Sequence, residues 1–596
     1  MKKRFLMIFG SYLFLAAAFT YPLVFKMKSC ILGTYTSDEP FAWLAYFWWQ
    51  QYAFSKHLVD TFCSVIAVPF GLDISSSILY PCWNIFSKWL SVSTGYIAAY
   101  NVQILLSFVL AGVTMFYLAY AVTKDKICSL LSGIIYSFCP YHFARAWQHL
   151  SLAQIQWMPL FLYALVKIED YPSRRNLFLG ILAVFLLAST ELHYFYFSYI
   201  ATVLFLVIYF LFCRKTGRCW KFLKRALIVM AAGIIFVFPA VANTTLKNAF
   251  FAKKSIQPSA WSVVRPFDDL FAQSARPLSY LLPSIAHPVF GKFTESFTGT
   301  SLYGESLTEH TLYLGWIPLA LAFIALKKSW KARKKINSKE YFYINFFIFL
   351  AVLSWILSQP PWWSIFGFKI YMPSFFMYKL LPMFRASGRF GILLMLAIAV
   401  LSAFGLRAVL EKFKSGKSKI AAAILLFGLV IFEFWNYPPL RVIDVEKVSQ
   451  AYYWLKEQPG DIIIAEYPLD AGSPNELYKF YQTVHEKRMI NGTTPYSYAN
   501  NIAKTIVKLS DQNTAGILKG MGVKYVLVHR ENYLYSDLVK DKEELDLIPK
   551  NNGLKLTVSF LGQECPRENI RCVQKAGPVD VYEVVAAPIG YKPEEK

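Results

Sequence analysis

Two adjacent carboxylates, Asp38 and Glu39, precede an aromatic segment that is too short to cross a membrane. This segment, Phe41–Trp49, has nine apolar residues and predicts a helix in the membrane interface, as does a second aromatic segment, Ile78–Leu90. Carboxylates there can act as a general base or bind a divalent cation, for a substrate with a lipid tail and a polar head. Asp38 and Glu39 also suit an N-cap and a first helical turn, which is the purely structural alternative.

Basic side chains that suit a phosphate group form two clusters. The first contains His142, Arg145 and His149, and its two histidines lie seven residues apart, too far along one helix to bind a single metal ion. The second contains Arg385 and Arg389, which share a face if a helix begins early and could then clamp a phosphate. Anchoring at the membrane surface is the alternative for both clusters.

Two groups of acidic residues and histidine could complete a site with Asp38. Glu191 and His193 fall in a tight turn, and the second group precedes an apolar run and comprises Glu305, Glu309 and His310. Each group is otherwise a cap at the membrane interface.

The elements that must position these residues are apolar runs of membrane-spanning length. Of the 596 residues, 56% are hydrophobic and only 16% are charged, which excludes a soluble globular protein. We expect about eleven transmembrane helices, with a turn at Glu191–Tyr194 dividing the longest apolar stretch. The runs cover residues 5–25, 98–122, 127–144, 150–167, 177–192, 194–213, 226–244, 310–326, 341–358, 388–409 and 420–437.

Basic residues are concentrated in the membrane part of the chain. Residues 1–437 contain 41 Lys and Arg but 16 Asp and Glu, and the basic residues gather on short loops, which indicates topology rather than nucleic-acid binding. The positive-inside rule places the N-terminus in the cytoplasm of a multi-pass protein of the cell membrane, inner or plasma. The same rule places the final domain, 438–596, outside the cytoplasm, together with the long loops 26–97, 245–309 and 359–387.

The sequence pattern of the final domain predicts an α/β fold outside the membrane. Two short apolar strands, 461–466 and 523–528, are separated by helical segments and should pair in parallel, with antiparallel edge strands at 553–561 and 579–586. Three polar residues at the strand ends could bind a ligand or lie on a solvated edge: Glu466, His529 and Arg530. Cys565 and Cys572 are either a disulfide or two free thiols.

This arrangement resembles the GT-C superfamily of integral-membrane glycosyltransferases, including bacterial YfhO-like proteins. The shared features are a first span followed by a long external loop that begins with Asp38-Glu39, short basic cytoplasmic loops, and an external α/β domain. Finer similarity lies in Pro69-Phe-Gly71, His149-Leu-Ser-Leu152, Gln156-Trp-Met-Pro-Leu160, Tyr313-Leu-Gly315, Pro382-Met-Phe-Arg385, Arg389-Phe390 and Met489-Ile-Asn-Gly492.

The resemblance implies an inverting transfer of a sugar from a polyprenyl-phosphate donor to a glycan, lipid or protein acceptor of the cell envelope. Asp38 would be the general base, with Glu39 beside it, and Arg145, Arg385 or Arg389 would stabilise the phosphate leaving group. Some GT-C enzymes use paired acids with a divalent cation, so Mg²⁺ or Mn²⁺ is an allowed cofactor. Two other functions remain open: a transporter of lipid-linked sugars, and a non-enzymatic envelope assembly or binding protein.

Overall fold

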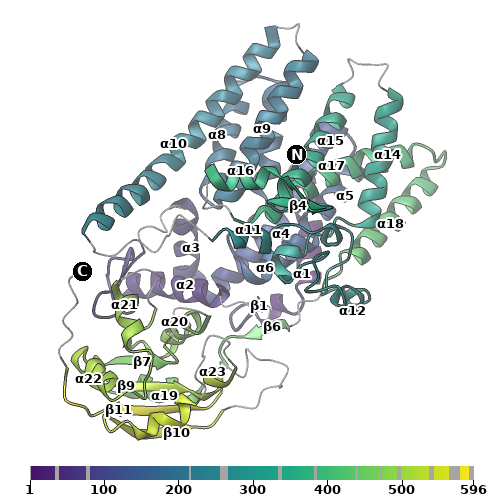
Figure 1. Ribbon diagram of the computed structural model, residues 1–596. Coiled ribbons are helices and arrows are strands. Elements are labelled where there is room, and N and C mark those ends of the chain that lie inside the picture. Colours follow the sequence, from purple (N-terminus) through teal and green to yellow (C-terminus); the bar gives the residue numbers. More distant parts are fainter. Residues whose placement is uncertain are drawn as a thin grey trace. The chain divides into compact units, whose positions relative to one another are not determined.

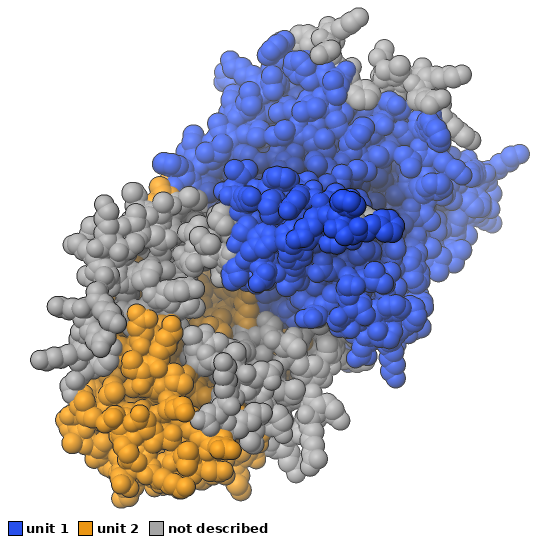
Figure 2. Space-filling model, viewed as in Figure 1, with its two compact units in different colours: residues 1–25, 102–238, 263–441 blue, residues 26–101, 239–262, 442–596 orange. Residues whose placement is uncertain are grey.

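The computed structural model describes most of the chain, in two compact units that interleave along the sequence (Figure 2). Unit 1 comprises residues 1–25, 102–238 and 263–441, and unit 2 comprises 26–101, 239–262 and 442–596. The sequence instead predicts one contiguous boundary between 437 and 438. The described residues are 2–33, 39–74, 81–213, 217–254, 266–332, 339–380, 385–436, 440–469, 473–492, 498–535, 543–562 and 577–589.

Unit 1 is built almost entirely from helices (Figure 1). At its centre lies α17 (Gly391–Leu410), in which every residue from 391 to 406 is buried. The helices packed against it are α5 (Lys126–Ser137), α14 (Trp316–Ala332) and α15 (Lys339–Ser358). The other helices of unit 1 include α1 (Lys2–Phe19), α4 (Tyr96–Thr123), α6 (Pro140–Gln148), α7 (Trp157–Asp170), α8 (Arg174–Ala188), α9 (Leu192–Cys213), α10 (Gly217–Lys254) and α18 (Gly416–Glu433). The start of α4, up to residue 101, and the end of α10, from residue 239, belong to unit 2.

Fewer of these helices meet the length and hydropathy of a membrane span than the sequence predicts. Within the described residues, five helices are long and apolar enough, and a bent pair raises the number to six, so the predicted eleven spans are not confirmed. A helix lies at every predicted run, but α7, α8 and α14 have only 14, 15 and 17 residues, short of the roughly 20 that a span needs. Helices of this length and hydropathy are those of a membrane protein.

The helices break at two places in unit 1. Arg145 lies after the first break, and Glu191 and His193 lie at the second. The predicted run 127–144 is divided into α5 and α6, which meet at a bend of 43°. The stretch 177–213 is also divided, because α8 ends at Ala188 and α9 begins at Leu192, which confirms the predicted pair of helices. The break lies at residues 189–191, earlier than the predicted turn at Glu191–Tyr194, so His193 lies in the first turn of α9.

Unit 2 contains a five-stranded mixed sheet of order β10-β11-β9-β7-β8. Its central strands β7 (Ile463–Tyr467) and β9 (Val523–His529) pair in parallel, and β11 (Val579–Val584) and β10 (Leu554–Phe560) continue the sheet in antiparallel register. The short strand β8 (Arg488–Met489) is parallel to β7 at the other edge. Helices α19 (Gln450–Glu457), α20 (Ser473–His485), α21 (Tyr498–Thr505) and α22 (Gln512–Gly520) connect the strands.

The aromatic segment that follows Glu39 is part of this second unit. It forms α2 (Glu39–Ser55), which packs against α3 (Pro81–Thr94) and α20. The rings of Phe41 and Phe480 lie 5.2 Å apart, and Trp48 and Trp49 are buried. Protein therefore covers four of its six aromatic side chains, Phe41, Phe47, Trp48 and Trp49, and its place in the membrane interface stays a prediction.

The close contact between α14 and α17 gives a stability prediction. A Cβ atom at Gly405 of α17 would overlap the backbone carbonyl of Leu321 on α14, and backbone cannot move aside as a side-chain tip can. We expect Gly405→Ala to destabilise the protein by about 1–3 kcal/mol, as overpacking does, which thermal unfolding in detergent would measure. Gly428→Ala on α18 is the matched control, since no atom lies within 4 Å of its Cβ position. Equal melting temperatures would contradict the packing of these two helices.

Candidate active site

The carboxylate of Glu309 joins two arginines in the interior of unit 1. It lies on the short helix α13 (Leu307–His310), whose N-cap Ser306 accepts a 3.1 Å hydrogen bond from the Glu309 backbone N–H. Arg145 of α6 donates from Nη1 to Oε1 at 3.0 Å and from Nη2 to Oε2 at 2.7 Å. Arg389, in the 3₁₀ turn η4 (Ser387–Phe390), donates from Nη2 to Oε1 at 3.0 Å. One carboxylate therefore fixes two guanidinium groups from distant segments.

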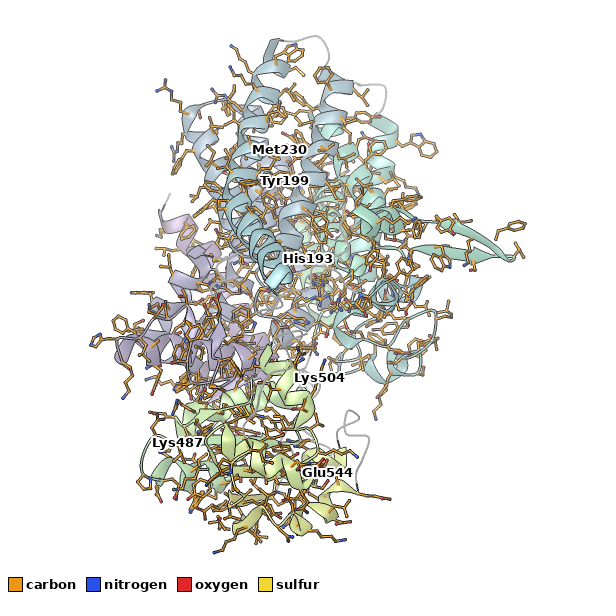
Figure 3. The ribbon with its side chains drawn as sticks, turned by 60° about the vertical axis from the view of Figure 1, so that its left-hand side comes forward. His193, Tyr199, Met230, Lys487, Lys504 and Glu544 are labelled. Atoms are coloured by element: carbon orange, nitrogen blue, oxygen red, sulfur yellow. The ribbon has the colours of Figure 1, made fainter. Side chains whose placement is uncertain are left out.

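A second series of polar contacts extends from Arg389 to the turn between α8 and α9. Arg389 Nη1 lies 3.2 Å from Nε2 of His193, whose Nδ1 lies 2.7 Å from Oε1 of Glu191 (His193 is labelled in Figure 3). Ser151 donates to the other oxygen of Glu191 at 2.9 Å. Because a guanidinium can only donate, these contacts assign the histidine proton to Nδ1 and leave Nε2 as the acceptor.

Aromatic and amide side chains hold the first arginine in place. The Arg145 guanidinium lies 4.8 Å from the ring centre of Tyr141, and the hydroxyls of Tyr141 and Tyr194 are 3.2 Å apart. Gln148 on α6 accepts a hydrogen bond from Thr308, which ties α6 to α13. Arg145 is fully buried, so its position is set by protein contacts alone.

The charges in this cluster balance, with two guanidiniums and two carboxylates. Burial raises the pKa of the Glu309 carboxyl, but the positive charges of Arg145 and Arg389 outweigh burial and hold that pKa well below its usual range. Glu309 is consequently ionised across the physiological pH range. Removing one member would leave a buried charge without its counter-ion, which is the costly change in such a network.

Only one end of the cluster is open. The side chains of Arg389 and His193 are 15% and 16% exposed, against 7% for Glu309 and none for Arg145. Within the described part of the chain, Arg389 uses three of its five N–H bonds, two toward Glu309 and one toward His193. Its two other N–H bonds can bind an anion, whereas Arg145 supports the cluster from inside.

Three further residues are predicted to bind phosphate: His142, His149 and Arg385. His142 is buried, with its ring nitrogens 3.1 Å from Ser107 Oγ and 2.6 Å from the Ser137 carbonyl oxygen, so both nitrogens have protein partners. Arg385 forms an ion pair with Asp269 and is one-third exposed. His149 is the half-buried C-cap of α6. These three residues keep their proposed role only as predictions.

Only some residues of the two predicted groups of acids and histidine belong to this cluster. Glu191, His193 and Glu309 belong to the cluster, whereas Glu305 is exposed. His310 is buried and donates from Nε2 to the Ser274 carbonyl oxygen at 3.1 Å.

Of the two adjacent carboxylates, Glu39 belongs to unit 2. Asp38 lies outside the described residues. Glu39 is the first residue of α2 and accepts a 3.1 Å hydrogen bond from the indole N–H of Trp43, the local contact expected of an acid in a first turn. The described residues contain no group of three or more His, Cys, Asp and Glu that could hold a metal ion, so a divalent cation remains a prediction.

Of the three strand-end residues, Glu466 and His529 form a buried pair, whereas Arg530 is exposed and pairs elsewhere. Glu466 Oε2 lies 2.8 Å from His529 Nε2 and accepts a 2.7 Å hydrogen bond from the Tyr452 hydroxyl. Burial raises the pKa of Glu466 above its usual value. Arg530 binds Asp580 through two nitrogens, at 2.6 and 2.7 Å. The candidate cysteines, Cys565 and Cys572, lie outside the described residues.

The sequence predicts the charged residues of the Glu309 cluster as candidates, but it does not predict which of them pair. Glu309 was one of several acids, and nothing local distinguishes it as the partner of both arginines. Asp269, the partner of Arg385, and Ser151, the partner of Glu191, were not identified. A carboxylate between apolar segments was the one available signal, because charges there usually need a partner.

Replacing the shared carboxylate should destabilise the fold. Glu309→Gln keeps the size of the side chain but leaves Arg145 and Arg389 without a counter-ion, so we expect a loss of about 3–5 kcal/mol. Thermal unfolding in detergent measures this loss, with Glu295→Gln as the matched control because Glu295 is exposed on α12 (Gly291–Glu295). A melting temperature as high as that of the control would show that the two ion pairs add no net stability.

The stability lost in Glu309→Gln should depend on pH in a defined direction. The folded pKa of Glu309 is depressed, so its contribution is fully present above the unfolded value of about 4.3 and is lost as the pH falls toward the folded value. We therefore expect the difference in melting temperature between wild type and Glu309→Gln to be constant from pH 7 to about 5 and to shrink below about pH 4.3. A difference that grew on acidification would have the wrong sign for an ionised carboxylate between two arginines.

Solved membrane glycosyltransferases resemble this structure. The arabinofuranosyltransferase AftD from Mycobacteria matches 97% of the chain with a TM-score of 0.52 and 14% identity, and this chain spans 42% of AftD. ArnT from Cupriavidus metallidurans, solved with undecaprenyl phosphate, matches 99% of this chain and 100% of its own, with a TM-score of 0.48 and 10% identity. The oligosaccharyltransferase from Archaeoglobus fulgidus matches 91% of this chain and 72% of its own, with a TM-score of 0.48 and 13% identity.

These neighbours are GT-C glycosyltransferases, and the likeness to AftD, at 14% identity, establishes the fold rather than the activity. No curated protein sequence matches the chain, and the resemblance to YfhO-like proteins stays a prediction. The family model described as "Domain of unknown function (DUF6311)" matches residues 66–436. Because this match covers more than half of the chain, the protein belongs to the DUF6311 family, and its fold is that of the GT-C membrane glycosyltransferases.

Proposed function

We propose that this protein is a membrane glycosyltransferase that moves a sugar from a polyprenyl-phosphate donor to a glycan, lipid or protein acceptor outside the cytoplasm. The observation that carries the proposal is the partly exposed side chain of Arg389, whose guanidinium buried Glu309 and the Glu191–His193 pair hold in place within a GT-C fold. An oriented cation with free N–H bonds suits the phosphate that such a donor releases.

The reaction would require little more than a base and a stabilised leaving group. The acceptor hydroxyl gives its proton to a carboxylate, and its oxygen forms a bond to the anomeric carbon. The bond from that carbon to the phosphate oxygen breaks, and its electron pair leaves with the lipid phosphate. Attack from the opposite side inverts the anomeric centre. The role of Asp38 as the base rests on the family resemblance alone.

Within this proposal, the arginines have different tasks. Arg389 would donate hydrogen bonds to the phosphate oxygens, where charge develops as the sugar leaves. Arg145 would not touch the donor, since it is fully buried and both of its terminal nitrogens bind Glu309. Arg145 and Glu309 would act as positioning residues that fix the direction of the Arg389 guanidinium.

The position of His193 adds a means of keeping Arg389 oriented without cancelling its charge. A neutral imidazole accepts one N–H bond of the guanidinium, whereas a second carboxylate at that place would compete with phosphate for the arginine. Glu191 sets the direction of the ring through Nδ1. The arrangement therefore leaves the cluster able to accept one further anion at its open end.

A transfer assay with purified protein in nanodiscs tests the proposal. It offers radiolabelled polyprenyl-phosphate sugars with envelope-glycan acceptors, with and without a divalent metal. We expect Arg389→Gln to reduce the rate of transfer by about 10²–10³-fold, as loss of one oriented donor does, and Asp38→Asn to reduce it by about 10²–10⁴-fold, as loss of a general base does. Arg488→Gln, at an exposed ion pair with Asp461, is the matched control.

The outcomes separate the two roles. Unchanged transfer by Arg389→Gln, in protein that melts like wild type, would remove Arg389 from the mechanism, and the same result for Asp38→Asn would remove Asp38. Binding of an intact donor by wild-type protein that shows no turnover with any acceptor would favour a carrier of lipid-linked sugars over a transferase.

A further inference from the structure

A β-hairpin with an exposed apolar tip projects from unit 1 (Figure 3). Its strands β4 (Trp362–Ile365) and β5 (Phe368–Tyr371) pair in antiparallel register and follow the spanning helix α15 after three residues. At the tip, Phe366 is 98% exposed and Phe368 is 77% exposed. The side chains of Ile370 and Tyr371 are half exposed on the same strand. Exposed aromatic rings of this kind are unusual for a hairpin in water, and no described side chain of unit 1 covers them.

The hairpin and the segment after it carry only basic charges. The neighbouring helix α11 (Asp268–Ala272) contributes two acids, since its Phe271 ring lies 4.5 Å from that of Trp362 and its Asp269 pairs with Arg385. Between residues 359 and 387 the sequence contains no Asp or Glu, and its ionisable side chains include Lys369, Lys379 and Arg385. The ammonium of Lys369 lies 4.6 Å from the ring centre of Trp362 at the base of the hairpin. Aromatic rings combined with basic side chains are typical of segments at the boundary between hydrocarbon and headgroups.

The exposed surface of the hairpin continues that of a membrane-spanning helix. On α15, Phe349, Val352 and Trp355 are between 41% and 51% exposed, as expected of side chains that face lipid. The indole of Trp355 packs edge-on against that of Trp363 in β4, with ring centres 6.2 Å apart. The lipid-facing side of the helix therefore passes to the hairpin without an intervening polar surface.

We propose that the hairpin β4–β5 lies in the membrane interface, with Phe366 and Phe368 inserted among the lipid chains and Lys369 at the phosphate level of the headgroups. The occupant of its apolar surface is the bilayer, since the surface is continuous with that of α15 and combines aromatic side chains with Lys369, as segments at the membrane boundary do. The helix that follows, α16 (Pro373–Leu380), has Phe376 56% exposed and Leu380 80% exposed and extends the same surface.

This anchoring has a consequence for the segment that leads to Arg389. The chain passes from the hairpin through α16 to the turn η4, whose Arg389 belongs to the charged cluster. An anchored hairpin would hold the start of this connection at the membrane surface. The inference concerns the hairpin itself and does not depend on the proposed transfer reaction.

Spin-label accessibility tests the location directly. A nitroxide is attached at Phe366→Cys in a cysteine-free background, in nanodiscs of phosphatidylethanolamine and phosphatidylglycerol. Collision with oxygen, which concentrates in lipid, is compared with collision with a water-soluble nickel chelate. Labels at Phe349→Cys and Thr557→Cys are the references, because Phe349 is half exposed on the spanning helix α15 and Thr557 is exposed on strand β10 of the sheet.

We expect the ratio of oxygen to nickel accessibility at position 366 to exceed that at 557 several-fold and to approach that at 349. A ratio equal to that at 557 would place the tip in water and overturn the proposal. A label shielded from both reagents would mean that protein covers the tip, from a partner or a second copy, and would overturn it as well.

A second measurement serves if the cysteine-free protein does not fold. A solvatochromic amino acid placed at position 366, with the native cysteines retained, should emit at a shorter wavelength in nanodiscs than the same residue at position 557. Emission at the same wavelength at both positions would again contradict insertion of the tip.

Discussion

The carboxylate of Glu309 is the group on which the charged interior of unit 1 depends, because two guanidiniums share it. Arg145 comes from α6 and Arg389 from the turn before α17, and both bind Glu309 on a helix of only four residues. Charges removed from water cost free energy unless they find a counter-ion in good geometry. The Glu309 carboxylate is the counter-ion of both arginines, since Arg145 donates two hydrogen bonds to it and Arg389 also binds it. Three segments of the chain are thereby joined at one side chain.

The need for a counter-ion also explains why the cluster has a fully buried end and a partly exposed end. Arg145 is fully buried and its terminal nitrogens are engaged by Glu309, so it sets the position of that carboxylate. Arg389 is fixed on one side by Glu309 and on another by the imidazole of His193, and within the described residues two of its five N–H bonds remain for an anion. An arginine oriented in this way can bind an anion without first being reoriented, which lowers the cost of binding.

Unit 2 depends on a different constraint, the burial of aromatic surface. The helix α2, with Phe41, Trp48 and Trp49 buried, packs on α20 beside the five-stranded sheet. The segment 26–101 and the segment 442–596 therefore belong to one compact unit, although more than 300 residues separate them in the sequence. Removing the final domain would expose the aromatic face of α2, so the two segments cannot be treated as independent modules.

The sequence by itself determined the membrane character, the positions of most helices, the turn before His193 and the residue types of the charged groups. These properties depend on local composition and periodicity, which a single chain displays directly. The tertiary structure alone decided that Glu309 pairs with Arg145 and Arg389, that Arg385 pairs with Asp269 instead, and that protein covers most of the aromatic residues in the segment after Glu39. The physical reason is that ion pairing and burial depend on which segments pack together, and residues that lie 80 or 164 positions apart leave no local trace of their contact.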